Sequence, residues 1–210
     1  SCNTAIGGGQ AGRCITTGSH NMMGGLNAGQ NITTGSNNVY FGQYVGVGAT
    51  TAANNVAIGN RAGRCNSGAR NVYLGYYAGS QGGTASNNTG AYNFVVGSSS
   101  GRCSTTGGCN ILLGTNAAYG LTTGSNNFIV GQNAAACATF TGSENVIIGT
   151  GAGKCGTSPA CNVFIGRYSG QQWTGGDNNI AIGKEALLGN SSNTTGSHNI
   201  ALGEKVGQEM

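Results

Sequence analysis

The chain has 210 residues, of which 42 are glycine, while charged side chains make up only 7% and apolar ones 38%. This composition fits neither a solvated disordered chain nor an ordinary enzyme domain. A collagen helix is excluded because glycine does not recur at every third position and the chain has one proline, Pro159. The net charge of +4 is spread along the chain without a basic cluster, which gives little support for nucleic-acid binding. No apolar run approaches the roughly 18 residues that span a bilayer, so we expect no membrane insertion.

One short pattern recurs along the chain. An asparagine is followed by three mostly apolar residues and a glycine, as in residues 55–59 and 179–183. The pattern occurs 12 times at intervals of 16 to 22 residues, and a repeat of this length indicates a solenoid. The asparagines that begin the units are Asn3, Asn21, Asn38, Asn55, Asn71, Asn93, Asn110, Asn127, Asn145, Asn162, Asn179 and Asn199.

Each unit is predicted to contain one short strand, formed by the apolar triplet, and a return segment rich in turn residues. A small residue and a glycine recur later in the unit, as in Ala28–Gly29, and predict a second tight corner. We therefore expect a single all-β domain over residues 1–210, a parallel β-solenoid (β-roll or β-helix) of about 12 coils with 16–22 residues per coil and no capping domain. In chain order, the expected strands are residues 4–6, 22–24, 39–41, 56–58, 72–74, 94–96, 111–113, 128–130, 146–148, 163–165, 180–182 and 200–202.

The repeated asparagine is predicted to form a structural ladder, in which side-chain amides of successive coils hydrogen-bond along the axis. A row of asparagines that binds a ligand is the alternative, and no other feature of the sequence favours it. Adjacent threonines recur on the return segment, as in Thr16–Thr17 and Thr122–Thr123, and predict hydroxyl ladders along one edge.

The apolar triplet has two faces, because its first and third residues share one face and its middle residue points the opposite way. Both faces are apolar, whereas a single-sheet solenoid buries only its inner face, so we expect the second face to be covered by another copy of the chain. The alternative is that the return segment of the same coil covers it. The residues that we assign to this interface are the larger middle residues, namely Tyr40, Tyr73, Val95, Leu112, Ile129, Ile147 and Phe164.

Both ends of the chain are expected to be open coils. Residues 1–2 close a coil, and residues 199–210 break off after Gly207. Placed before residues 1–2, the last 12 residues would give 14 residues to the next asparagine, close to one coil. Uncapped ends predict head-to-tail stacking into a fibre, since terminal coils otherwise expose unpaired strand edges. The alternative is that the sequence is an excerpt without its caps.

Eight cysteines occur in the repeats, and their positions favour disulfide bonds. Two pairs lie six residues apart on either side of a return segment, and a third occupies the same two registers in neighbouring coils. Disulfide bonding favours an extracellular setting. Cys65 and Cys137 are roughly 19 Å apart at the strand spacing, so they are expected to be free or to join chains. The predicted pairs are Cys103–Cys109, Cys155–Cys161 and Cys2–Cys14.

We expect no catalytic, cofactor or metal site, and no enzymatic role. The five carboxylates form no acid–base pair, and the two histidines, His20 and His198, lie at opposite ends of the chain. No Cys-x-x-Cys motif is present, which disfavours zinc. N-glycosylation patterns occur on turn segments at Asn31, Asn87, Asn190 and Asn193.

The units at residues 55–59, 179–183 and 199–203 resemble the short repeat in the heads of trimeric autotransporter adhesins, and similar Gly/Asn repeats occur in phage fibre proteins. The resemblance covers all 12 units. It implies a left-handed parallel β-roll, three chains packed through it, and a surface that binds host matrix or other cells.

The sequence as a whole predicts an extracellular structural protein, on a cell or virion surface, whose main partner is itself. An adhesin or phage-fibre head that binds cell-surface glycans or matrix is the second hypothesis. An ice-binding solenoid is the third, although a flat Thr-x-Thr strand face is expected for ice binding and adjacent threonines in a turn fit it poorly.

Overall fold

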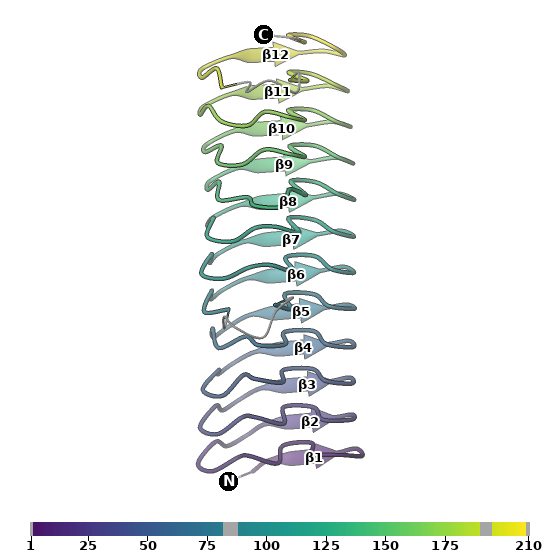
Figure 1. Cartoon of the computed structure of the whole chain (residues 1–210), viewed down its shortest axis with the longest axis vertical. Coiled ribbons are helices and arrows are strands. Elements are labelled where there is room, and N and C mark those ends of the chain that lie inside the picture. The colour runs from purple at the N-terminus through teal and green to yellow at the C-terminus, as the bar shows by residue number, and fades with distance from the viewer. Residues whose placement is uncertain (1, 82–87, 190–194, 209–210) are drawn as a thin grey trace.

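The computed structural model describes residues 2–81, 88–189 and 195–208, and Figure 1 shows the chain as one column of stacked coils. Each coil contributes one strand of three residues, and no helix occurs among the described residues. The predicted all-β solenoid is therefore confirmed, and so is every expected strand range. The strands are β1 (Thr4–Ile6), β2 (Met22–Gly24), β3 (Val39–Phe41), β4 (Val56–Ile58), β5 (Val72–Leu74), β6 (Phe94–Val96), β7 (Ile111–Leu113), β8 (Phe128–Val130), β9 (Val146–Ile148), β10 (Val163–Ile165), β11 (Ile180–Ile182) and β12 (Ile200–Leu202).

All 12 strands form one parallel sheet whose spatial order is the chain order. The register is the same at every step, because the first, middle and third residues of one triplet pair with their equivalents in the next, as Val163, Phe164 and Ile165 do with β11. Identical register stacks equivalent side chains in straight rows along the axis. Any repeated residue of the sequence therefore becomes a row on the molecule.

The middle residue of each triplet points into the column. From β2 to β12 its side chain is at most 2% exposed, and only Ala5 of β1 is exposed. The predicted interface residues, Tyr40, Tyr73, Val95, Leu112, Ile129, Ile147 and Phe164, are therefore core residues, and assigning them to a contact between chains was wrong. The return segment of the same coil covers them, with buried side chains of its own such as Ile32, Leu121, Phe140 and Trp173.

Tight corners fold each return segment onto the sheet. The glycine that directly follows each triplet lies close to its equivalent in the next coil. At Gly131 φ is +135°, and a Cβ there would lie 2.5 Å from the carbonyl oxygen of Gly149. The repeated small-residue–glycine pair forms the second corner, where Gly153 has a φ of +58° and Ala152 is fully buried. Glycine at these corners follows from the backbone geometry that coil stacking requires.

Candidate functional site

The outward face of the sheet is the most extended apolar surface that the structure describes. It consists of the first and third residues of the triplets, which are all exposed or half-buried and are apolar except at Thr4 and Gly24. We call this surface the outer face. Its most exposed large side chains lie on the end strands, where Ile6, Ile200 and Leu202 are 61% to 70% exposed. On the strands between them, Met22, Phe41, Ile58, Phe94, Ile111, Phe128 and Ile182 are each between 38% and 47% exposed.

Polar side chains border the outer face on both sides. One border is the residue before each repeated asparagine, as at His20, Asn37 and Asn126, and the other is the residue after the glycine that ends the triplet, as at Gln43 and Gln132. An apolar strip between polar borders has the layout of a protein–protein interface, in which an apolar centre is shielded from water and a polar rim stays hydrated.

The asparagine ladder is confirmed. The Oδ1 of Asn110 accepts hydrogen bonds from the backbone N–H and the Nδ2 of Asn127, both at 3.0 Å. The Nδ2 of Asn110 donates to Oδ1 of Asn93 and to the carbonyl oxygen of Gly124, also at 3.0 Å. Both the amide oxygen and the amide nitrogen of Asn110 are thus fully hydrogen-bonded, and the residue is 1% exposed. The same bonds recur along the column, so the row joins each coil to the next and closes each coil, and it has no capacity left for a ligand.

The predicted threonine ladder is also present, with hydroxyl groups donating to backbone carbonyls of the next coil. Thr33 Oγ1 donates to Thr50 O at 3.1 Å, and Thr105 Oγ1 to Thr122 O at 2.8 Å. The other threonine of each pair, such as Thr34, is exposed. Adjacent threonines therefore have different roles, one structural and one at the surface.

The predicted disulfide bonds are not present, because all eight cysteines, Cys2, Cys14, Cys65, Cys103, Cys109, Cys137, Cys155 and Cys161, are free. The pairing assumed that the return segment folds back on itself. Instead it runs along the coil, where Cys103 N–H bonds to Tyr119 of the following coil and Cys109 N–H to Ala91 of the preceding one. Six residues span up to about 20 Å when extended, whereas the Cα atoms of a disulfide lie within about 7 Å.

One of these thiols, Cys161, donates to Glu144 Oε2 at 3.3 Å. This hydrogen bond, followed by desolvation and nearby negative charge, raises the pKa of the thiol, which therefore stays protonated and a poor nucleophile. Among the described residues, no group of three or more His, Cys, Asp or Glu side chains could hold a metal ion. In the same part of the chain, no helix is long and apolar enough to cross a membrane.

Charged and aromatic side chains gather at the corner that follows the strands. Arg61 lies over the rings of Tyr44 and Tyr77 at 5.7 and 5.1 Å from their centroids. Arg102 lies over Tyr77 at 4.6 Å and over Tyr119 at 5.8 Å. These cation–π contacts link successive coils along one edge of the column. This edge was not predicted from the sequence, because its residues occupy two registers, six residues after the repeated asparagine for Tyr44, Arg61 and Tyr77 and nine for Arg102 and Tyr119.

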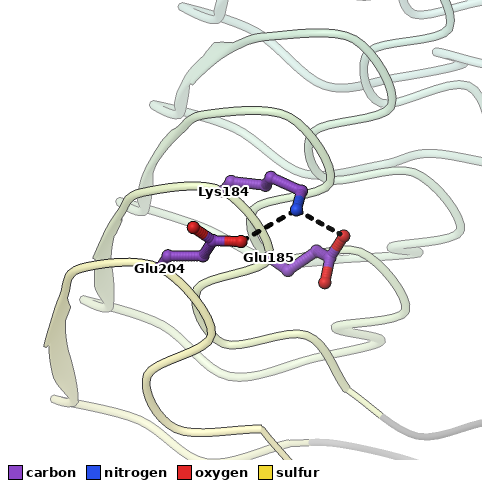
Figure 2. A network of polar contacts seen from close by, with 3 residues as sticks. All are labelled: Lys184, Glu185 and Glu204. Atoms are coloured by element: carbon purple, nitrogen blue, oxygen red, sulfur yellow. Dashed lines mark hydrogen bonds and ion pairs between the residues drawn. The ribbon is translucent and has the colours of Figure 1, made fainter.

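The edge continues at the last coils as an ion-pair network, which Figure 2 shows. Lys184 Nζ lies 2.8 Å from Glu204 Oε1 and 3.8 Å from Glu185 Oε1. The hydrogen bond from Lys184 lowers the pKa of Glu204, and the same bond raises the pKa of Lys184. Both side chains are exposed, so the pair contributes little to stability.

A pocket of about 330 Å³ opens on the same edge, between the coils that begin at Asn110 and Asn127. It is lined by Asn116, Tyr119, Asn133, Ala136, Cys137 and Ala138. Of the predicted glycosylation sites, Asn31 is exposed, while Asn87, Asn190 and Asn193 lie outside the described residues.

Neither a family model, nor a curated protein, nor a solved structure matches this chain. The resemblance to adhesin heads therefore stays a prediction that rests on the repeated residues.

Proposed function

We propose that the chain is a structural segment of an extracellular fibre, in which solenoids associate side by side through their outer faces. The observation that carries the proposal is the apolar strip that runs over all 12 strands with exceptions at Thr4 and Gly24, and we assign its partner as a second copy of the chain. The strip is straight and has a constant register, and a second copy offers a surface of the same length and spacing.

The size of the strip supports this assignment. Strands about 4.8 Å apart and three residues of about 3.3 Å each make a strip of about 50 by 10 Å, or roughly 500 Å². That area lies at the upper end of the range found for the largest apolar patch on a typical monomer. With the polar borders added, the surface approaches the roughly 800 Å² per partner of a stable interface.

End-to-end growth is the second part of the proposal. Among the described strands, β1 pairs only with β2, and β12 only with β11, so the outer edge of each carries open ladder positions. A further coil in the same register can continue the sheet and the asparagine ladder there, whether it comes from the same chain or from another copy. The extracellular setting rests on the likeness to adhesin heads, because the free cysteines remove the support that disulfide bonds would have given.

Light scattering on size-separated protein, together with negative-stain electron micrographs, tests the proposal. We expect oligomers or filaments whose melting temperature rises with protein concentration, because association stabilises the folded state. Phe128→Lys places a charge in the centre of the outer face and should give folded monomers. Gln132→Lys, in the polar border of the same coil, adds the same charge and should leave association intact.

A wild-type chain that stays monomeric at high concentration would contradict the proposal of side-by-side association. Equal behaviour of the two lysine variants would mean that association uses another surface.

Ice binding is a second candidate function, and one observation favours it. The exposed threonine of each pair, as in Thr34, is followed by a buried small residue and then a partly exposed one, Gly35 and Ser36. In the coils of Thr17, Thr34, Thr123, Thr141 and Thr195 the array is therefore Thr-x-Ser, with residues i and i+2 facing solvent, whereas the other coils have Ala or Gly at i+2. The exposed members of this row are Thr17, Thr34, Thr51, Thr89, Thr106, Thr123, Thr141, Ser158 and Thr195.

Such a row repeats hydroxyl and methyl groups at the strand spacing, a regularity that can order water. Thermal hysteresis measured on a freezing droplet checks this candidate. Activity that Thr106→Lys abolishes and Phe128→Lys preserves would support it, and freezing without hysteresis would eliminate it.

A further inference from the structure

The pocket on the corner edge arises where a small residue stacks between two large ones. These residues occupy the ninth position after the repeated asparagine, which in four successive coils holds Arg102, Tyr119, Ala136 and Lys154. Because equivalent residues stack in rows, the methyl group of Ala136 leaves open the space that a larger side chain would fill. The pocket of about 330 Å³ includes Tyr119 and Ala136 in its lining.

Tyr119 gives this pocket an aromatic wall. Its ring lies between Arg102 of the preceding coil, whose guanidinium carbon is 5.8 Å from the ring centroid, and Ala136 of the following coil. The ring is half-buried and lines the pocket, while the cation of Arg102 lies over it from the preceding coil. An aromatic face of this kind binds the C–H side of a ring-shaped ligand by stacking.

Two side-chain amides supply directional polar groups beside that wall. Asn116 Nδ2 donates to Asn133 Oδ1 at 3.2 Å, which fixes both side chains. The Asn116 Oδ1 acceptor and the Asn133 Nδ2 donors take no part in this bond, and both residues line the pocket. A ligand hydroxyl can donate to the first and accept from the second, which suits a polyol rather than an apolar molecule.

The charge around the pocket is positive. Arg102 lies one coil before Tyr119 and Lys154 one coil after Ala136, while none of the lining residues is acidic. Arg102 is occupied by its contacts with the rings of Tyr77 and Tyr119. Lys154 lies in the coil after Ala136, about 5 Å further along the axis, and is therefore the cation that can reach an anionic substituent of a ligand in the pocket.

From these four features we propose that the pocket binds one acidic sugar residue of a glycan, with its ring on Tyr119, its hydroxyls on Asn116 and Asn133, and its carboxylate toward Lys154. The volume lies at the low end of ligand pockets, which matches one sugar ring rather than an extended chain. The site does not depend on the outer face. It would give the adhesin-type hypothesis a defined class of ligand.

Calorimetric titration with methyl glucuronide, and with methyl glucoside as the neutral counterpart, tests the proposal. We expect saturable binding in which the glucuronide is preferred at least about tenfold, a difference of about 1.4 kcal/mol. Tyr119→Ala should abolish binding of both sugars. Tyr44→Ala removes a tyrosine from the same edge outside the pocket and should change nothing. Lys154→Gln should remove the preference for the acid and leave binding of the glucoside unchanged.

Cys137 offers a second readout, because it lines the pocket, whereas Cys65 lies at the equivalent position of another coil outside it. Both thiols are free and half-buried. The glucuronide should slow alkylation of Cys137 by iodoacetamide and leave Cys65 unaffected, as measured by peptide mass spectrometry.

No saturable binding of either sugar, or equal protection of the two thiols, would overturn the proposal. Titrations repeated on Phe128→Lys separate this result from association, because that variant retains the pocket and disrupts the outer face.

Discussion

The two faces of each strand differ in what covers them, although their residues are alike. Phe164 is the middle residue of β10 and is fully buried, whereas Phe128 is the first residue of β8 and is 38% exposed. Both are phenylalanines in triplets of apolar residues. The inner row is covered by the return segment of its own coil, and the outer row has no cover within the described chain. The inner row therefore determines whether the column folds, and the outer row determines what the folded column contacts.

The largest expected effect comes from the inner row. Phe164→Ala should lower the free energy of unfolding by about 3–5 kcal/mol, because it removes a buried ring and leaves a cavity between packed coils. Chemical denaturation followed by circular dichroism measures the change. A loss no greater than that for Phe128→Ala would contradict the distinction between the two faces.

A somewhat smaller loss of folding stability is expected from a substitution in the asparagine ladder, which runs beside the inner row. Asn110→Ala removes the partners of the Asn127 backbone N–H and of the Gly124 carbonyl. It also removes one of the two hydrogen bonds to Asn93 Oδ1, which keeps the bond from the backbone N–H of residue 110. Buried polar groups without partners cost about 1–3 kcal/mol each, and partial relaxation of the coil should bring the total to about 3 kcal/mol. Denaturant titration checks the value.

Asn60→Ala is the matched control for the ladder, because Asn60 donates only to Gln43 on the exposed surface. Its effect should stay within about 0.5 kcal/mol, as for most surface substitutions. Comparable losses for the two variants would mean that the ladder does not hold the coils together.

The repeat allowed the strands, their order and the asparagine ladder to be predicted, because identical register turns every repeated residue into a row. It did not allow the inner row to be distinguished from the outer one. Residues such as Ile147 and Ile148 are equally apolar, and only the path of the return segment decides which of them is enclosed. The disulfide prediction failed for the same reason. The pocket depends on Ala136 stacking between Tyr119 and Lys154, which becomes visible only when the coils are stacked.

A substitution in the outer row should weaken association between chains more than it lowers the stability of the folded chain. Phe128→Ala removes a side chain that is only partly buried in the single chain, so the monomer should lose less than about 1 kcal/mol, below the range for a buried Phe. Its melting temperature should depend less on protein concentration than that of the wild type, because the outer face loses contact area. Scanning calorimetry at several concentrations measures this dependence. A stability loss as large as that of Phe164→Ala would place Phe128 in the core.

The smallest expected effect belongs to the exposed ion pair at the last coils (Figure 2). Glu204 has a lowered pKa, so its contribution is present above the unfolded-state pKa and is lost as pH falls through the lower folded-state value. Lys184 has a raised pKa, so its contribution is present below the unfolded-state pKa and is lost as pH rises through the higher folded-state value. Lys184→Met should therefore lower the melting temperature only between these limits, by about 1 °C or less, since exposed pairs contribute little. Melting temperatures of the wild type and the variant, measured from about pH 3 to about pH 11, should become equal at the two extremes. A difference that persists at acid pH would show that Lys184 acts through packing rather than through its charge.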